Sequence, residues 1–223
     1  QTAVNEFDSI YLYEEKGSVV HGYTNRSFPN VSVESQYLTV TYYDDYSYSG
    51  AKDFNTSVNI SGYVNGSLNY FNRTKSLVTG TKTLVLDGGS TFLTSTTYYD
   101  DKYRPIQIIS DLYDSASGVE TVSNKYDFTG KVLETRTSQK FNNITTTVNT
   151  YYSYDHAGRL LKTEQEIDGD SNERVTLASM SYNELGQLVQ KNLHVSSQGA
   201  LNTIDYKYNI RGWLTGLNDP DDL

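Results

Sequence analysis

The chain has 223 residues, among them 21 Tyr and 7 Phe but only 3 Pro and no Cys, and its formal net charge is −9. This length suits one or two domains with a sizeable core, and residue types that favour strands and turns are abundant. The acidic charge disfavours nucleic acid and anionic membranes, which bind clustered Lys and Arg. The lack of Cys excludes disulfides and thiolate zinc sites. We therefore expect an all-β protein that does not bind nucleic acid.

The first 40 residues carry no recognisable motif. The opening QTAVNEFDSI lacks the basic start and apolar stretch of a signal peptide, and no apolar run reaches the roughly 20 residues of a membrane helix. The chain therefore looks like an interior piece of a longer polypeptide. We assign residues 1–95 to an N-terminal β-rich segment with degenerate repeats, and residues 96–223 to a repeat region continuous with it.

Tyr–Asp pairs first appear at Tyr43–Asp44, in TVTYYDDYSYSG, and again 56 residues later at Tyr99–Asp100, in TYYDDKYRPI. The separation is twice 28, which is the spacing of the clearer copies that follow. The half-way stretch NYFNRTKSLVTG has aromatic residues but no clear turn. After Asp100, Arg104 and Pro105 stand where a turn glycine and its follower are expected, so we predict a turn of different geometry there.

Four clear copies follow in the sequence: YDFTGKVL, YDHAGRLL, YNELGQLV and YNIRGWLT, at steps of 28, 28 and 26 residues. Asp or Asn at the first position of a type I turn accepts a hydrogen bond from the backbone two residues on, and Gly at the fourth position can take a positive φ. The pattern therefore predicts four hairpin turns, formed by Tyr126, Asp127 and Gly130; Tyr154, Asp155 and Gly158; Tyr182, Asn183 and Gly186; and Tyr208, Asn209 and Gly212.

The segments between these turns alternate as strands do. KVLETRTSQ, RLLKTEQEI and QLVQKNLHV each end at a polar tip, after which a second strand such as TTTVNTYYSY returns. In this register Tyr154 faces Leu160 and Asp155 faces Arg159 across the hairpin. We therefore predict antiparallel β-hairpin repeats that form one continuous, strongly twisted, open sheet.

The repeat pattern resembles the YD repeats of the bacterial Rhs (rearrangement hot spot) family. YDHAGRLL and YNELGQLV carry the repeat, while TYYDDKYRPIQ, YNELGQLVQKNLH and YNIRGWLT look like the lead-in to an Rhs repeat-associated core, so the resemblance covers about Thr39 to Asn218. The resemblance implies a secreted or cell-surface protein of the bacterial envelope, in which YD repeats form a spiralling sheet that encloses a C-terminal toxin. It implies no cofactor and no enzymatic role for the repeats. The implied partners are the remaining repeats and the C-terminal domain of the same polypeptide.

One feature of the family pattern is missing. Rhs cores end in a DPxG-type motif where the chain is cut, but here Asp219 and Pro220 are followed by Asp221 and Asp222. We therefore predict neither self-cleavage nor toxic activity.

The closely spaced Asp155, His156 and Arg159 invite a catalytic interpretation, as acid, base and anion clamp. However, the positions equivalent to His156 in the other copies hold Phe128, Glu184 and Ile210. Catalysis would not tolerate that variation, and neither His21 nor His194 lies in a recognisable triad motif. We predict a turn and no catalytic residues.

IDGDSNE places Asp168, Asp170 and Asn172 like the first ligands of a calcium loop, but Glu173 stands where that loop needs Gly and Ser179 where it needs Glu. The alternatives are a metal loop and a solvated hairpin tip, and we favour the tip.

The many tyrosines allow a carbohydrate-binding interpretation, because aromatic rings offer flat apolar faces to sugars. One Tyr at a fixed place before each turn is better explained by an internal aromatic ladder. Trp213, at the variable turn position, is the best candidate for a glycan contact. Seven Asn-x-Ser/Thr sequons also occur, at Asn25, Asn30, Asn55, Asn59, Asn65, Asn72 and Asn143.

The leading hypothesis is a non-enzymatic scaffold, a segment that builds part of a β-shell. The alternative is a carbohydrate-binding or adhesion module that displays tyrosines. No arrangement of residues in the sequence supports an enzymatic function. A piece cut from such a sheet has unpaired edge strands, so self-association through these edges is expected.

Overall fold

The computed structural model describes residues 11, 13–28, 31, 33–113, 118–167 and 174–218. Within these ranges the chain is built of strands, with one short 3-10 turn, η2 (Glu34–Gln36). The strands are β1 (Lys16–Val20), β2 (Thr39–Asp44), β3 (Thr74–Leu84), β4 (Phe92–Tyr99), β5 (Pro105–Asp111), β6 (Val119–Tyr126), β7 (Val132–Phe141), β8 (Ile144–Tyr154), β9 (Leu160–Ile167), β10 (Val175–Tyr182), β11 (Leu188–Ser196), β12 (Gly199–Tyr208) and β13 (Leu214–Leu217). The prediction of an all-β chain is confirmed.

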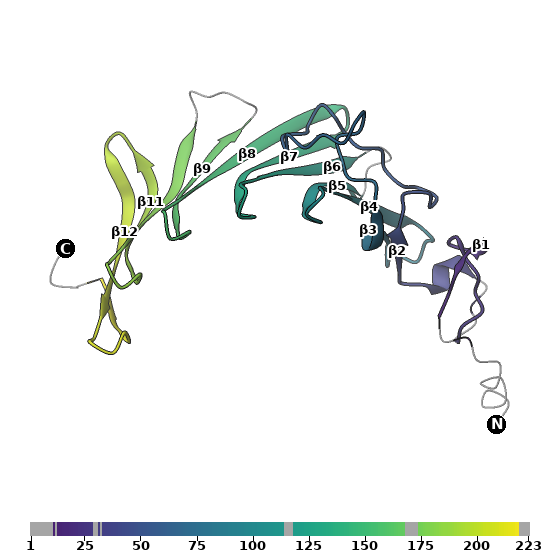
Figure 1. The fold of residues 1–223 in the computed structure, drawn as a ribbon, viewed down its shortest axis with the longest axis horizontal. Coiled ribbons are helices and arrows are strands. Elements are labelled where there is room, and N and C mark those ends of the chain that lie inside the picture. The colour runs from purple at the N-terminus through teal and green to yellow at the C-terminus, as the bar shows by residue number, and fades with distance from the viewer. Residues whose placement is uncertain are drawn as a thin grey trace. The chain divides into compact units, whose positions relative to one another are not determined.

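Twelve of these strands form one sheet in which every strand lies beside its neighbours in the sequence, from β2 through to β13 (Figure 1). The pairs for which a register is defined are all antiparallel. β2 and β13 stand at opposite ends of this order, so the sheet is open. This meander confirms the prediction of successive antiparallel hairpins.

The chain divides into two compact units, Gln1–Ser57 with Gly62–Thr121, and Val58–Ser61 with Val122–Leu223. The boundary in the sheet falls within β6. The two units differ in how they bury their strands.

In the first unit, one face of the sheet is covered by the irregular connection from β2 to β3. Strand β4 alternates as expected for a half-buried strand, with Thr94, Thr96 and Tyr98 buried. The connection packs on this face: the hydroxyl of Tyr98 donates to the carbonyl of Lys52 at 2.6 Å. Two groups of rings complete the core: Tyr42 stacks on Tyr48, and a second group has stacked, tilted and edge-on contacts among Tyr46, Phe54, Tyr70 and Tyr98.

This connection corrects the interpretation of the 56-residue spacing. β2 ends at Asp44 and β3 begins at Thr74, so only one hairpin, β3–β4, lies between Tyr43 and Tyr99. The other half of the spacing is irregular chain, and its aromatic side chains serve to cover the sheet. The two Tyr–Asp pairs are therefore separated by one repeat and one insertion, and not by two repeats.

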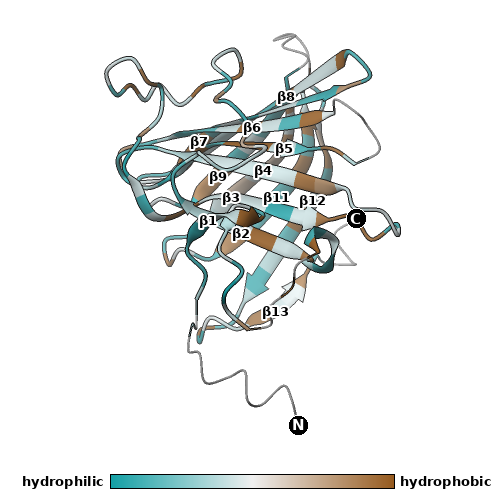
Figure 2. Cartoon of the chain, turned by 90° about the vertical axis from the view of Figure 1, so that its right-hand side faces the viewer, coloured by the Kyte–Doolittle hydropathy of each residue, from teal (hydrophilic) through white to brown (hydrophobic). Residues whose placement is uncertain are grey.

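The second unit has little covering of this kind. In the described part of Val122–Leu223, the buried residues are all polar: Ser123, Ser138, Asn149, Glu166 and Thr176. The larger apolar side chains of these strands are part-exposed or exposed, and polar and apolar residues follow each other closely along the strands (Figure 2). Because apolar residues are normally the most deeply buried ones, this part of the sheet is a single layer without a conventional core.

Candidate functional site

The predicted turns are the most regular feature of the chain, and the turn at Asp155 shows their construction. The N–H of Asp155 donates to the carbonyl of Arg159, and the N–H of Gly158 donates to the carbonyl of Asp155, both at 2.9 Å. Oδ1 of Asp155 accepts the N–H of Arg159 at 2.8 Å. Gly158 has φ of +84°, which a residue with a Cβ adopts only at a cost. Next to the turn, Tyr154 pairs with Leu160 across a bulge.

All four clear copies have this geometry. Asp127, Asn183 and Asn209 each receive the corresponding amide hydrogen bonds, and Gly130, Gly186 and Gly212 have φ of +97°, +81° and +80°. The Tyr–Leu pairs of the last two copies are Tyr182 with Leu188 and Tyr208 with Leu214.

A fifth copy lies at Asp100, where a different geometry was expected. The N–H of Asp100 donates to the carbonyl of Arg104 at 3.0 Å, and the N–H of Tyr103 donates to that of Asp100 at 3.1 Å. Tyr103 has φ of +60° and occupies the glycine position, while Tyr99 pairs with Pro105. The expectation is wrong because the alignment was off by one residue: the turn is the same, with a tyrosine held in the left-handed region.

From the turn at Asp127 onward, each turn contacts the next one through the long polar residue after its glycine. The ammonium of Lys131 lies 5.8 Å from the ring centroid of Tyr154, in the following turn. A Cβ built on Gly158 would lie 2.7 Å from Cε of Lys131, so the glycine leaves room for that side chain. The guanidinium of Arg159 lies 4.7 Å from the ring centroid of Tyr182 and 3.2 Å from a Cβ on Gly186, and Nε2 of Gln187 lies 3.1 Å from a Cβ on Gly212.

Four of the turn tyrosines are held by the strand backbone at one end and by a hydrogen bond from the ring hydroxyl at the other. The hydroxyl of Tyr154 donates to the carbonyl of Val132 at 2.9 Å, at the start of the strand before it. The same bond recurs from Tyr182 to Leu160 and from Tyr208 to Leu188, each at 2.9 Å, and from Tyr99 to Val78 at 2.6 Å. These rings are partly buried and their hydroxyls are occupied, as an internal ladder requires. Tyr126 is likewise partly buried.

The acidic groups of the turns are stabilised in their charged form. The hydrogen bond from the Thr129 hydroxyl, together with those from backbone amides, lowers the pKa of Asp127 to about 2. Desolvation raises the pKa of Asp155, but the bonds from Arg159 outweigh it and leave the pKa below its ordinary value. Nε of Arg159 pairs with Oδ2 of Asp155 at 2.6 Å. The carboxylate of Asp155 is thus held by hydrogen bonds and an ion pair within its own turn.

The histidines show no catalytic arrangement. His156 is exposed at its turn, and His194 is exposed on β11. His21 is buried, with Nε2 at 3.1 Å from the carbonyl of Glu34 and its ring edge-on to Phe92. Among the residues that the structure describes, no group of three or more His, Cys, Asp or Glu side chains could hold a metal ion. The calcium-like residues Asp168, Asp170, Asn172 and Glu173, and the Asp219–Pro220 pair, lie outside the described residues.

Trp213 is the equivalent of Lys131, Arg159 and Gln187 in the last copy. Its side chain is 63% exposed, and the guanidinium of Arg211 lies 5.6 Å from its ring centroid. It is therefore available for contact, in contrast to the turn tyrosines.

Several sequons have a structural use. Oδ1 of Asn55 accepts the N–H and the hydroxyl of Ser57, and Oδ1 of Asn59 binds Ser61 in the same way. Asp127 and Thr129 form this Asx turn without a sequon. Asn25 and Asn65 are part-exposed, Asn72 and Asn143 are exposed, and Asn30 lies outside the described residues.

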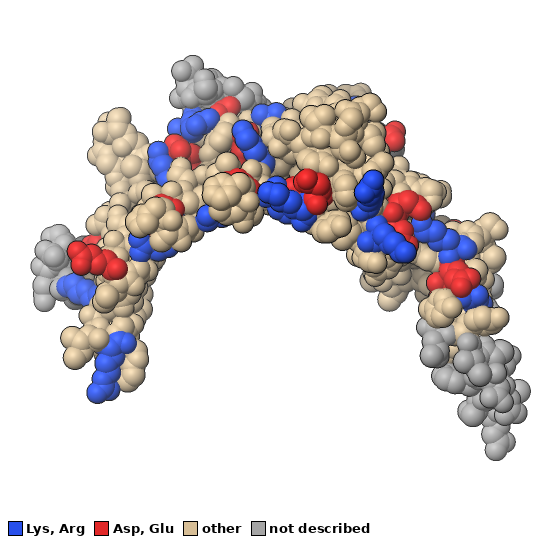
Figure 3. All heavy atoms as spheres, in the orientation of Figure 1, with Lys and Arg blue, Asp and Glu red and all other residues tan. Residues whose placement is uncertain are grey.

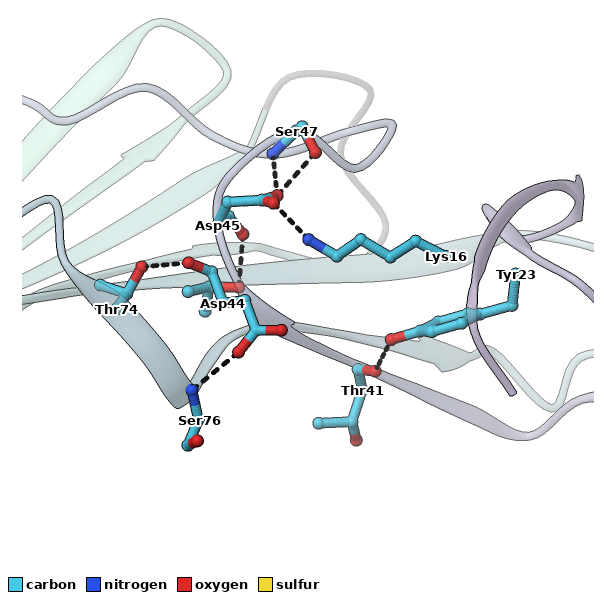
Figure 4. A network of polar contacts seen from close by, with 9 residues as sticks. Lys16, Tyr23, Thr41, Asp44, Asp45, Ser47, Thr74 and Ser76 are labelled. Atoms are coloured by element: carbon cyan, nitrogen blue, oxygen red, sulfur yellow. Dashed lines mark hydrogen bonds and ion pairs between the residues drawn. The ribbon is translucent and has the colours of Figure 1, made fainter. Parts of the chain in front are cut away.

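A polar network that the sequence did not predict joins β2 to the segment before it (Figure 4). Lys16 pairs with Asp45, which also accepts the N–H and hydroxyl of Ser47. The hydroxyl of Tyr23 donates to the carbonyl of Thr41 at 2.6 Å. Lys16 lies 29 residues from Asp45, and Tyr23 lies 18 residues from Thr41, so no local pattern could reveal these two contacts.

Two small cavities flank this network. One, of about 210 Å³, is lined by residues that include Val20, His21, Tyr37 and Val40. The other, of about 140 Å³, is lined by residues that include Lys16, Tyr43 and Asp45. Burial raises the pKa of Tyr42, which lines the second cavity, to about 12, and its hydroxyl donates to the carbonyl of His21 at 2.8 Å. The polar groups named here form hydrogen bonds and ion pairs with one another, as is typical of groups that stabilise a fold.

Charges on the visible surface are mixed. Lys and Arg lie beside Asp and Glu over the face shown in Figure 3, in agreement with the ion pairs Lys52–Asp111, Arg104–Asp100 and Lys162–Glu164. Such a face offers no basic track to a phosphate backbone.

The chain matches no protein-family model, and no curated protein matches it. In the part of the chain that the structure describes, no helix has the length and apolarity needed to cross a membrane.

Proposed function

We propose that the chain is a non-enzymatic scaffold, a segment of a secreted or cell-surface Rhs-type protein that builds part of a spiralling β-shell. The shell would enclose or present a C-terminal domain of the same polypeptide. The repeats of the chain would form the wall of the shell, and any catalytic activity would belong to the enclosed domain.

The contact between successive turns carries this proposal. Lys131, Arg159 and Gln187 each lie against the glycine of the following turn, so the repeats from Tyr126 onward are shaped to fit one another. Stability in such an array comes from nearest-neighbour interfaces, as in other repeat proteins. The single-layer sheet of the second unit supports the same role. A sheet that forms the wall of a shell encloses no hydrophobic core by itself, and both of its faces are left for other parts of the protein to cover.

The carbohydrate-binding alternative rests on one specific observation. Trp213 is exposed, with Arg211 beside it, whereas the turn tyrosines have occupied hydroxyls. A sugar would therefore have to meet the chain at Trp213 rather than along the tyrosine ladder.

A glycan array separates the two functions. For a scaffold, we expect no saturable binding by the isolated chain and no difference between the wild type and Trp213→Ala. Saturable binding that Trp213→Ala abolishes would contradict the scaffold and support the adhesion module.

Enclosure is tested on a polypeptide in which this chain is followed by a C-terminal domain, as the proposal requires. Its C-terminal domain should resist a protease that digests the same domain in isolation. Digestion of the domain at equal rates in both settings would contradict an enclosing shell.

A further inference from the structure

The larger of the two cavities named above lies in the first unit, between β2 and the segment that precedes it, and much of its wall is apolar or aromatic. Val20 and Val40 line it and are buried, and the rings of Tyr23 and Tyr37 line it beside them. The hydroxyl of Tyr23 donates to the carbonyl of Thr41 at 2.6 Å (Figure 4), and that of Tyr37 is also bound within the chain. An apolar cavity of about 150 Å³ can hold a benzene ring. This cavity, of about 210 Å³, therefore has room for a small aromatic molecule.

His21 lines the same cavity, and its ring is held in one orientation. Nε2 lies 3.1 Å from the carbonyl oxygen of Glu34, which also accepts the N–H of Tyr37 at 3.2 Å. The ring packs edge-on against Tyr37 and Phe92, at 5.6 and 4.7 Å between ring centroids. Because a carbonyl oxygen can only accept, Nε2 carries the hydrogen. In the neutral ring Nδ1 is then a hydrogen-bond acceptor.

Nδ1 of His21 has no partner among the described residues, which is unusual for a buried polar side chain. His21 is 8% exposed, and the one hydrogen bond of its ring is the bond from Nε2. Buried polar groups are normally paired within the protein or with water. His21 is nevertheless not among the side chains with a fully enclosed, unpaired polar atom, so Nδ1 borders accessible space. The accessible space that His21 lines is the cavity, and an acceptor therefore opens on it.

The charges around the cavity decide which kind of ligand fits. Glu14 lines it, and its carboxylate already accepts four hydrogen bonds, Oε1 from the N–H and the hydroxyl of Ser27 and Oε2 from the hydroxyl of Thr24 and the N–H of Arg26. Desolvation raises the pKa of Glu14, but these bonds outweigh it and lower the pKa to about 2. No Lys or Arg is among the described residues that line the cavity, so an anion would meet a carboxylate without a countercharge. A cation would lose its water and find both oxygens of that carboxylate occupied.

We propose that the cavity beside His21 binds a small neutral aromatic molecule that carries one O–H or N–H group, of which phenol is the simplest. The ring would lie among the valines and tyrosines of the wall, and the O–H would donate to Nδ1 of His21. This arrangement pairs the unpaired acceptor and places an apolar body against an apolar wall, as is typical of small-molecule sites. Because Val20 and Tyr23 belong to the segment before β2 and Val40 belongs to β2, the ligand would also hold the two together. The site goes beyond the scaffold function and does not depend on it.

The histidine resonances test this contact directly, because the chain has three His, of which His21 is buried while His156 and His194 are exposed. The whole chain is titrated with phenol at about pH 8, where an ordinary His is neutral. We expect the ¹⁵N resonance of Nδ1 of His21 to move to lower frequency and to saturate at millimolar phenol, while those of the two exposed histidines stay in place. Toluene, which has the ring without the hydroxyl, should bind with a smaller shift of Nδ1. Benzoate, which is an anion, should not saturate.

Variants separate the acceptor from the cavity, with affinities read from the methyl resonances of Val40. His21→Phe keeps a ring but removes Nδ1, and the carbonyl of Glu34 keeps its hydrogen bond from the backbone N–H of residue 37. The ratio of phenol affinity to toluene affinity should fall roughly tenfold in this variant, as expected for one lost hydrogen bond. Val20→Phe fills the cavity and should weaken the binding of both probes. Val19→Phe, at a 62% exposed neighbour that does not line the cavity, should bind them as the wild type does.

Three results would overturn the proposed site. If neither phenol nor toluene saturates the wild type, the cavity holds water alone. If phenol saturates while Nδ1 of His21 does not move, the acceptor plays no part in binding. If benzoate binds more tightly than phenol, the site selects a charge and not a neutral donor. The wild-type titration decides between these results even if His21→Phe does not fold, and none of them bears on the glycan array that tests the scaffold function.

Discussion

At the scale of single residues, the turn glycines should be the least replaceable positions of the repeats. Gly130 and Gly158 both have positive φ, but a Cβ on Gly130 meets nothing within 4 Å, whereas one on Gly158 meets Lys131. Valine at either position should lower the free energy of unfolding by more than ~1 kcal/mol, since branched residues tolerate the left-handed region poorly. Denaturant unfolding of Gly158→Val, with Gly130→Val as the matched variant, measures this. Unchanged stability in both variants would contradict the hairpin register.

Tyr103 allows the opposite experiment. It is 58% exposed and holds φ of +60° at the position that glycine occupies in the other turns. Tyr103→Gly should therefore stabilise the chain by up to about 1 kcal/mol, because the left-handed strain is relieved. Its edge contact with Phe71, at 6.0 Å between ring centroids, offsets part of the gain. A loss of more than about 1 kcal/mol in urea unfolding would mean that the ring contact outweighs the strain.

His156 should be dispensable. It is exposed, and Phe128, Glu184 and Ile210 stand at its position in the equivalent turns. We expect His156→Ala to retain the circular dichroism spectrum and the unfolding midpoint of the wild type. Loss of a hydrolytic or transfer activity in this variant would restore the catalytic interpretation of the Asp–His–Arg cluster.

At the scale of the element, the turns differ in their response to acid. The pKa of Asp127 is lowered in the folded chain to about 2, against an ordinary value near 4. The stability that its charged carboxylate contributes is therefore present above about pH 4 and is lost as the pH falls toward 2. Asn183 and Asn209 accept the same amide bonds without a charge. Protection of the Lys131 amide should therefore fall between pH 4 and pH 2 more than that of the Gln187 amide. In Asp127→Asn the difference should disappear, as hydrogen exchange would show; a difference that persisted would assign the effect to another acid.

The elements that were predictable from sequence are those whose geometry is local. A Tyr–Asx–x–x–Gly stretch fixes a turn because the Asx side chain and the glycine φ act within five residues, and the strands follow from alternation on either side. The connection from β2 to β3 has no period, so its packing over Thr96 and Tyr98 could not be read from spacing. The turn at Asp100 was misjudged for another reason: no glycine marks its fourth position, so the glycine position was placed at Arg104, one residue too late, whereas Tyr103 holds the left-handed conformation there. The Lys16–Asp45 pair joins residues 29 positions apart and leaves no local sign.

At the scale of the whole molecule, protection from hydrogen exchange should be high in the repeats around Tyr126, Tyr154 and Tyr182 and should decrease toward β13. Turns at Tyr126, Tyr154 and Tyr182 are followed by a further hairpin, whereas the turn at Tyr208 is followed by the four-residue strand β13. Because repeat interfaces supply stability to both neighbours, amides near the first three tyrosines should exchange slowly and those beyond Gly212 rapidly. Exchange measured by mass spectrometry on a dilute monomer tests this gradient. Leu217→Pro should leave the slow amides unchanged, since β13 contributes at the edge alone. Uniform protection up to Asn218 would contradict this gradient and would mean that β13 is held as stably as the strands that have a neighbour on both sides.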